Sequence, residues 1–351
     1  MGNHPVDPAI SNRTHDANHG KYRTALTSVE LCAGAGGQAL GLHQAGFSHL
    51  ALVDNDPHCV ATLQQNFKTS NIYLEDLRTW NVKPFEGVDL LAAGLPCPPF
   101  SKAGKQFGSD DERNLFPATL EIIAQIKPRA IMIENVPGLM DMKFGEFRAD
   151  LETQLEKMGY VSIWQVLNAS NYGVSQLRPR VMFLALHKNV ATHFSFPPPL
   201  SSPPPTVGEA LYNLMAEKGW RKAIEWKEKA NRIAPTLVGG SKKHGGPDLG
   251  PTRAKKAWAS LAVNGHLIAA SAPEPDFDAD PYLTVKMCAR LQGFPDEWSF
   301  FGKKTASYRQ VGNAFPPPVA AAVGKQLYRA LEADRKFTGI YGRSYAQNTD
   351  R

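Results

Sequence analysis

Short apolar runs alternate with longer amphipathic stretches between residues 27 and 186, and this alternation restricts the fold more than any other feature of the sequence. The stretches between the runs, such as 57–67 and 115–127, have the pattern of amphipathic helices. Continuous apolar runs between helices are typical of parallel strands that are buried on both faces. The sequence therefore predicts an α/β fold with strands at 28–32, 49–54, 88–94, 130–135 and 181–186. Ligands lie at the carboxyl ends of such strands, so the residues that follow each run are the candidate site residues.

Prolines divide the chain into two parts of different character. A length of 351 residues suits one large domain and one smaller domain, and the cluster PPPLSSPPP at 197–205 marks the best boundary. Residues 206–283 lack the regular alternation, which predicts a small domain of irregular, mostly extended structure. Residues 316–337 begin with three prolines and are predicted to form a final helix.

Composition excludes several classes of protein. The excess of 39 basic over 33 acidic residues gives a net charge of +6, which permits a nucleic-acid partner without requiring one. Apolar runs are too short to cross a bilayer, and the first residues lack an apolar segment of signal-peptide length, so we expect a soluble, cytosolic protein without membrane contact. The four cysteines form no CxxC pair, which argues against a disulfide scaffold and against a structural metal site.

A glycine-rich turn, ELCAGAGG, follows the first predicted strand. Gly34 and Gly36 allow a tight turn and a close approach of a ligand to the backbone. Asp54 ends the second strand, where a carboxylate accepts hydrogen bonds from the ribose of a nucleoside. Asp76 follows the next apolar stretch and could reach an adenine amino group or be a solvated loop carboxylate. The turn alone leaves a nicotinamide cofactor, an adenosyl cofactor and a purely structural turn open.

Three further strand ends carry reactive or charged residues. Cys97 lies among three prolines in LPCPPFS, a stiff loop that suits a positioned nucleophile, although a small buried cysteine fits nearly as well. Glu134 ends an apolar strand, which is costly unless the carboxylate is solvated or partnered. In QLRPR, alternation along an extended segment would place Gln176, Arg178 and Arg180 on one face, or on a solvated edge.

Taken together, these motifs resemble those of the DNA cytosine-5 methyltransferases of bacterial restriction-modification systems. ELCAGAGG, PCPPFS, ENV, QLRPR, RLQGFPD and QVGNAFPPPV occur in the family's order and span nearly the whole folded chain. The resemblance implies a Rossmann-like, S-adenosylmethionine-dependent methyltransferase sheet with a smaller, irregular target-recognition domain. It divides the chain into a tail at 1–24, a catalytic and cofactor domain at 25–189, a DNA-reading domain at 190–285, a return segment at 286–340 that completes the catalytic domain, and a second tail at 341–351.

The resemblance also assigns catalytic roles. Cys97 would add to C6 of cytosine, Glu134 would share a proton with N3, and Arg180 would contact O2. Arg178 would support the site and contact the DNA backbone. Because C5 and C6 are sheltered inside a duplex, the target nucleotide would be flipped out of the helix.

S-adenosylmethionine is the cofactor that the resemblance implies, with S-adenosylhomocysteine as the product and no metal. Asn55 stands where many relatives place an aromatic residue over the adenine, so stacking at this position is in doubt. The implied contacts are Cys32, Ala33, Gly34, Gly36, Gly37, Asp54, Asn55, Asp76, Leu77, Pro96, Leu115 and Asn313.

Double-stranded DNA is the implied substrate, and its contacts are expected in two regions. The loop from 101 to 113 would close over the DNA, and the window 241–258 carries five basic residues against one acidic residue. The expected contacts are Ser101, Lys102, Lys105, Arg113, Gln176, Lys242, Lys243, Arg253, Lys255 and Lys256.

The resemblance further implies a monomer in the bacterial cytoplasm, with a cognate restriction endonuclease acting separately. Two alternatives remain open, a methyltransferase with the same chemistry on tRNA and a catalytically silent DNA-binding relative. A nicotinamide dehydrogenase fits only the glycine turn and leaves PCPPFS unexplained.

Overall fold

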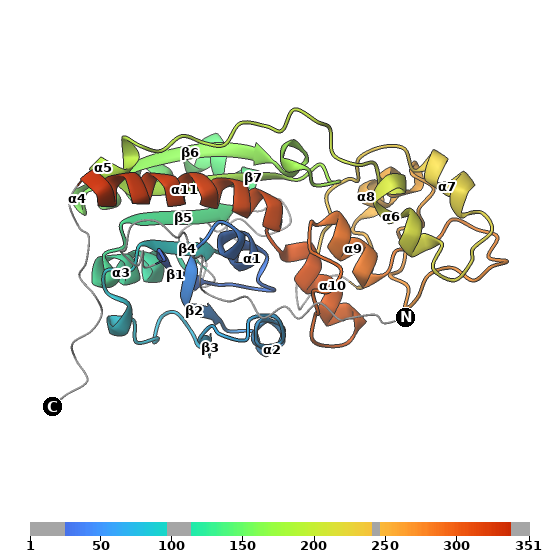
Figure 1. The fold of residues 1–351 in the computed structure, drawn as a ribbon, viewed down its shortest axis with the longest axis horizontal. Coiled ribbons are helices and arrows are strands. Elements are labelled where there is room, and N and C mark those ends of the chain that lie inside the picture. Colours follow the sequence, from blue (N-terminus) through green and yellow to red (C-terminus); the bar gives the residue numbers. More distant parts are fainter. Residues whose placement is uncertain (1–24, 97–113, 241–245, 338–351) are drawn as a thin grey trace, which may run out of the picture.

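A single seven-stranded sheet forms the centre of the larger domain (Figure 1). The computed structural model describes residues 25–96, 114–240 and 246–337. The strand order is β3-β2-β1-β4-β5-β7-β6. The strands are β1 (Thr27–Leu31), β2 (Ser48–Asp54), β3 (Ile72–Leu74), β4 (Leu90–Gly94), β5 (Ala130–Asn135), β6 (Tyr160–Asn168) and β7 (Pro179–His187).

All five predicted strands are confirmed as β1, β2, β4, β5 and β7, but the prediction of a parallel sheet is wrong at one end. Strands β1 to β5 are parallel, whereas β7 runs antiparallel to both β5 and β6. Strand β6 was missed because it lies at an edge of the sheet and is only partly buried, so its sequence is not a continuous apolar run.

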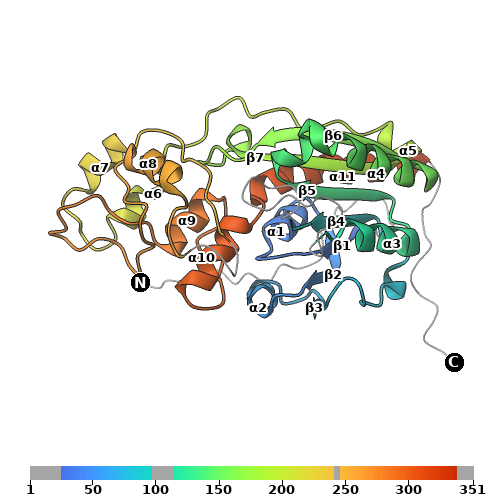
Figure 2. The ribbon, with the colours of Figure 1, turned by 180° about the vertical axis from the view of Figure 1, so that it is seen from behind.

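Helices cover both faces of the sheet. One apolar cluster packs α3 and α4 against the sheet, and a second packs α1, α5 and α11 against the other face (Figures 1 and 2). The helices of this domain are α1 (Gly37–Gln44), α2 (Pro57–Asn66), α3 (Phe116–Ile126), α4 (Gly145–Lys157), α5 (Lys188–Ala191) and α11 (Pro317–Phe337). Short 3-10 helices lie at η1 (Lys83–Phe85), η3 (Pro137–Met140), η4 (Met142–Phe144) and η5 (Ala169–Tyr172).

The small domain is irregular, as predicted, but its regular elements are helices, which corrects the prediction of mostly extended structure. Its helices are α6 (Val207–Met215), α7 (Ala223–Lys229), α8 (Thr252–Ala259), α9 (Val285–Leu291) and α10 (Lys304–Asn313), and Figure 1 shows them beside the sheet. Among its described residues, strand pairing is limited to isolated bridges. Thr206 and Glu209 form a capping box that starts α6, a local signal that the prediction overlooked. Helices α9 and α10 share one apolar cluster with α6, α7 and α8, and the same cluster includes Ala33, Leu52 and Leu63 of the larger domain. The boundary at residue 285 stays a prediction.

The C-terminal helix α11 closes the larger domain against α1. A Cβ atom at Gly37 would lie 2.2 Å from the carbonyl oxygen of Phe315, and one at Gly41 would lie 2.4 Å from that of Pro317. The two backbones therefore touch at positions where only glycine fits. No helix of the described residues is both long and apolar enough to cross a membrane.

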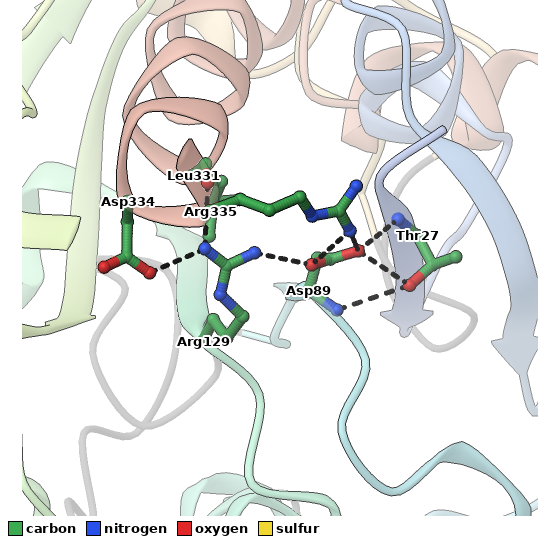
Figure 3. A network of polar contacts seen from close by, with 6 residues as sticks. All are labelled: Thr27, Asp89, Arg129, Leu331, Asp334 and Arg335. Carbon is green, nitrogen blue, oxygen red and sulfur yellow. Dashed lines mark hydrogen bonds and ion pairs between the residues drawn. The ribbon is translucent and has the colours of Figure 1, made fainter. Parts of the chain in front are cut away.

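An ion-pair network fixes α11 to the amino ends of the central strands (Figure 3). The Asp89 carboxylate accepts hydrogen bonds from the backbone N–H of Thr27 at 2.8 Å and from Arg129 Nη1 at 2.8 Å. Arg129 Nη2 also donates to Asp334 at 2.7 Å, and Arg335 donates to Asp89 at 3.3 Å. These contacts lie at the amino ends of the strands, whereas the predicted site lies at the carboxyl ends. Their role is therefore to hold the fold together.

Candidate active site and cofactor turn

The glycine-rich turn joins β1 to α1 with three residues in left-handed backbone conformations. Cys32, Gly34 and Gly36 have φ values of 51°, 55° and 82°. Gly36 is the N-cap of α1, and its N–H donates to the carbonyl of Ala33 at 2.9 Å. Glycine adopts these angles without strain, whereas Cys32 adopts its angle at a cost. The turn is therefore held in a defined shape, with backbone N–H groups at the start of a helix.

Asp54, at the end of β2, faces this turn. Its Oδ2 accepts a hydrogen bond from Gly34 N–H at 2.8 Å, and its Oδ1 accepts one from Asp56 N–H at 2.8 Å. Asp76 follows β3 and accepts from both the backbone N–H and the guanidinium of Arg78, each at 3.0 Å. Burial and the negative charges of Asp54 and Asp76 together hold the pKa of the Cys32 thiol well above its usual range. The two carboxylates predicted to bind the cofactor therefore lie close to one thiol.

The other predicted cofactor residues fall into two groups. Ala33, Leu77 and Leu115 are buried, and Leu77 and Leu115 share one apolar cluster below the strand ends. Asn55 and Pro96 are exposed. Asn313 is also exposed and donates to the carbonyl of Gly240 at 3.3 Å, so the structure places it against the small domain. Two residues later, the backbone of Phe315 lies against Gly37 of the turn.

Glu134 and Arg180 form an ion pair on neighbouring strands. Arg180 Nε lies 2.8 Å from Glu134 Oε1, and the two side chains are 14% and 13% exposed. Burial raises the pKa of the Glu134 carboxyl, and the positive charges of Arg180 and Arg178 lower it by a smaller amount. A raised pKa suits a carboxyl group that shares a proton with a ligand.

The end of β4 directs the chain toward this ion pair. Gly94 is the register partner of Glu134, and Pro96 is the last described residue before the predicted nucleophile Cys97. Cys97 itself lies outside the described residues. The same holds for the predicted DNA contacts Ser101, Lys102, Lys105, Arg113, Lys242 and Lys243.

Two residues of QLRPR do not lie on an accessible face, which corrects the predicted DNA contacts of Gln176 and Arg178. They are 0% and 1% exposed, and their side chains bond to other segments of this chain. Alternation along the chain was a poor guide here because both residues precede β7 and are covered by segments distant in the sequence. Arg178 remains near the ion pair, since its charge acts on Glu134.

The predicted DNA contacts of the small domain that lie among the described residues differ in their surroundings. Arg253 and Lys256 are exposed on α8. Lys255 is partly buried and forms an ion pair with Asp248, with 2.9 Å between Nζ and Oδ2. Arg253 and Lys256 are therefore better placed than Lys255 to meet a phosphate.

Two residues near the turn were missed in the sequence. Trp298 Nε1 donates to the carbonyl of Ala35 at 3.2 Å, and its ring lies where a Cβ atom on Gly36 would stand 3.0 Å away. Glu30 is 1% exposed, burial raises the pKa of its carboxyl, and its Oε2 has no hydrogen-bond partner among the described residues. The acidic residue inside an otherwise apolar strand was a visible signal for Glu30. Trp298 is 262 residues from Gly36, so local pattern could not identify it.

Comparison with known proteins agrees with this arrangement of motifs and strands. The family model of the C-5 cytosine-specific DNA methylases matches residues 26–329. The type II methyltransferase M.NaeI of Lentzea aerocolonigenes is 51% identical over 332 residues, covering 93% of this chain and 79% of the relative. M.NgoMIV of Neisseria gonorrhoeae is 49% identical over 312 residues, covering 88% and 99%.

A solved structure extends the comparison to the fold. A crystal structure described as a DNA modification methyltransferase encoded within an E. coli prophage has a TM-score of 0.63 and 26% identity, and the match covers 88% of this chain and 100% of that one. The sequence and the fold lead to the same conclusion: this chain belongs to the C-5 cytosine-specific DNA methylase family.

Proposed function

We propose that this protein transfers the methyl group of S-adenosylmethionine to C5 of a cytosine within a specific sequence of double-stranded DNA. The buried Glu134–Arg180 ion pair carries the proposal. It lies at the carboxyl ends of β4 and β5, where β4 leads toward Cys97. One carboxyl with a raised pKa and one guanidinium can together bind N3 and O2 of a cytosine.

The residues of the turn fit S-adenosylmethionine. At Gly34 no atom lies within 4 Å of the position of a Cβ atom, so the backbone is open to a ligand. The Oε2 atom of Glu30 is buried without a partner in the described part of the chain, and Asp54 and Asp76 add negative charge nearby. S-adenosylmethionine supplies an electrophilic methyl group on a positively charged sulfonium. An acidic site favours this cation over the neutral product S-adenosylhomocysteine, which supports release after transfer.

The chain's own residues then carry the chemistry on the base. The Cys97 thiolate forms a bond to C6, while Glu134 donates a proton or a hydrogen bond to N3 and so accommodates the electrons displaced into the ring. Arg180 donates a hydrogen bond to O2 and keeps the ring oriented so that the thiolate approaches C6 from one face of the ring. C5 becomes nucleophilic and would bond the methyl carbon as the bond from that carbon to the sulfonium sulfur breaks, leaving S-adenosylhomocysteine. A base then removes the C5 proton, the bond between sulfur and C6 breaks to return the thiolate, and any proton held by N3 returns to Glu134. Neither the cofactor nor these steps requires a metal.

The small domain is proposed to bind the duplex. The exposed Arg253 and Lys256 on α8 suit phosphate contacts, as do Ser101, Lys102, Lys105, Arg113, Lys242 and Lys243 of the segments that are not described. We infer a monomer that acts in the bacterial cytoplasm and protects host DNA from a cognate restriction endonuclease acting separately. The names of M.NaeI and M.NgoMIV as type II methyltransferases support this role.

Methyl transfer to duplex DNA and to tRNA can be compared directly. The protein is incubated with methyl-labelled S-adenosylmethionine and either substrate, and the DNA product is sequenced after bisulfite treatment. We expect label in duplex DNA at one cytosine of a short recurring sequence, and loss of that label in Cys97→Ala while cofactor binding persists. Label in tRNA alone, or full turnover by Cys97→Ala, would overturn the proposal.

A further inference from the structure

Arg178 is a fully buried arginine whose guanidinium bonds to backbone carbonyls. It is 1% exposed, and Nη1 donates to the carbonyl of Leu237 at 2.8 Å. Nη2 donates to Gly312 at 2.8 Å and to Ala314 at 3.0 Å. Removing a guanidinium from water is costly, and burial lowers its pKa well below the usual range. In return, the side chain donates hydrogen bonds to three carbonyls from two segments of the chain.

These acceptors belong to parts of the protein that are distant in sequence. Leu237 lies in the segment 234–240 that runs through the small domain, and Gly312 and Ala314 lie at the junction between α10 and α11. Gln176 binds the same residue through its other backbone group, because its Oε1 accepts from Leu237 N–H at 2.8 Å. Gln176 and Arg178 thus hold both the N–H and the carbonyl of one residue of the small domain.

The segment around Leu237 and the α10–α11 junction are closely packed against each other. A Cβ atom at Gly312 would lie 2.4 Å from the backbone nitrogen of Gly239, so the two segments touch backbone to backbone. Gln176 Nε2 also donates to Gln292 Oε1 at 2.6 Å, which adds the end of α9 to the same contact. Close-packed backbones move together, because neither can shift without a clash.

Arg180, which forms the ion pair with Glu134, lies two residues after Arg178. Strand β7 carries Arg180, and Arg180 bonds Glu134 on β5. The positive charges of Arg180 and Arg178 both act on Glu134 and lower the pKa of its carboxyl. The short segment from Gln176 to Arg180 therefore connects the small domain to the group that would hold the base.

We propose that Arg178, supported by Gln176, is a positioning residue that fixes the small domain relative to the Glu134–Arg180 ion pair, so that DNA held by the small domain presents its target base in register. This inference rests on the proposed function. It assigns Arg178 no contact with the base or with phosphate. Its effect is on alignment, and a misalignment of about 1 Å costs about 100-fold in rate.

The test compares Arg178→Lys with the same substitution at a partly buried arginine elsewhere. Arg129→Lys is the control, because Arg129 also joins distant segments with its guanidinium but lies at the amino ends of the strands, away from the site. Single-turnover and steady-state rates, cofactor affinity and urea unfolding are measured for both. Bisulfite sequencing of plasmid DNA treated with the enzyme measures the methylation rate at the target sequence and at sequences that differ from it by one base pair.

For Arg178→Lys we expect a loss in kcat of about 10-fold to 100-fold, cofactor affinity within about twofold of wild type, and a smaller ratio of target to near-target methylation. Arg129→Lys should lower stability and leave kcat and this ratio unchanged. If wild type methylates DNA and the two variants behave alike, the inference fails while the proposed function stands. Absence of cytosine methylation by wild type would instead remove the proposed function.

A second variant keeps the test open if Arg178→Lys does not fold. Gln176→Met keeps the side-chain volume but cannot accept from Leu237 N–H. It should lower kcat and the target ratio in the same direction, with cofactor affinity retained. Wild-type kcat and ratio in folded Gln176→Met would overturn the inference.

Discussion

A buried histidine joins the two elements that flank the cofactor turn. His49 on β2 is 7% exposed; its Nε2 lies 2.9 Å from the carbonyl of Ala39 in α1, and its Nδ1 lies 2.8 Å from the hydroxyl of Ser28 in β1. Because a carbonyl only accepts, Nε2 carries the proton and Nδ1 accepts from Ser28. Both ring nitrogens are engaged by the neutral form, and burial lowers the pKa of His49 to about 4.

This shift makes stability depend on pH with a definite sign. In the unfolded chain a histidine titrates at its ordinary value of 6.5. Between pH 6.5 and 4 the unfolded chain therefore binds a proton that the folded chain excludes, and stability falls as the pH falls. The difference between the pKa of 6.5 in the unfolded chain and about 4 in the folded chain corresponds to about 3 kcal/mol once the pH is below both values, and to about 2.5 kcal/mol between pH 7.5 and pH 4.5.

Urea unfolding of wild type and His49→Gln at several pH values between 7.5 and 4.5 measures this contribution. Glu30 and Glu134 have raised pKa values, which act in the opposite direction, but they are common to both proteins and cancel in the difference. Wild type should lose about 2.5 kcal/mol more than His49→Gln over this range. His193→Gln removes an exposed histidine and should follow wild type. Equal losses in wild type and His49→Gln would refute the assignment of a buried neutral imidazole.

Three further predictions concern packing, the ion-pair network and the site. Gly41→Ala should destabilise the protein by about 1–3 kcal/mol, because its Cβ would lie 2.4 Å from the carbonyl of Pro317; Gly145→Ala, with open space around it, should stay within about 0.5 kcal/mol in the same urea titration. Arg129→Met should cost about 3–5 kcal/mol by thermal or urea unfolding, because the buried carboxylates of Asp89 and Asp334 each lose a guanidinium partner. Glu134→Gln should lower the methyl-transfer rate about 10²-fold to 10⁴-fold while calorimetry shows unchanged cofactor affinity.

Strands buried on both faces could be predicted from the sequence, and their direction could not. The apolar runs of β1, β2, β4, β5 and β7 identify buried strands, because each position faces helices on one side or the other. The antiparallel direction of β7 depends on β6, an edge strand that lacks a continuous apolar run. The pairing of Glu134 with Arg180 across β5 and β7 follows from that direction, so the sequence named both residues without showing that they touch.

The small domain illustrates a different limit. Its capping box at Thr206 and Glu209 was a local helix signal, and reading it would have corrected the prediction of extended structure. Its core was not predictable in the same way, because three tryptophans at 220, 226 and 258 pack with residues of α9 and α10 that follow later in the chain. Local pattern predicts an element; it does not predict which distant element will cover it.

Arg178 and Arg180 show why residue type and spacing do not decide a role. They are two residues apart, and an extended segment would give them the same environment. Arg180 lies on β7 beside the carboxyl end of β5, where a carboxylate is available and part of the guanidinium stays accessible. Arg178 lies one residue before that strand, where Leu237 and Gly312 close over it and offer only carbonyl oxygens. A guanidinium that meets a carboxylate at a strand end can still bind a ligand, whereas one whose Nη1 and Nη2 donate to backbone carbonyls holds those segments in place.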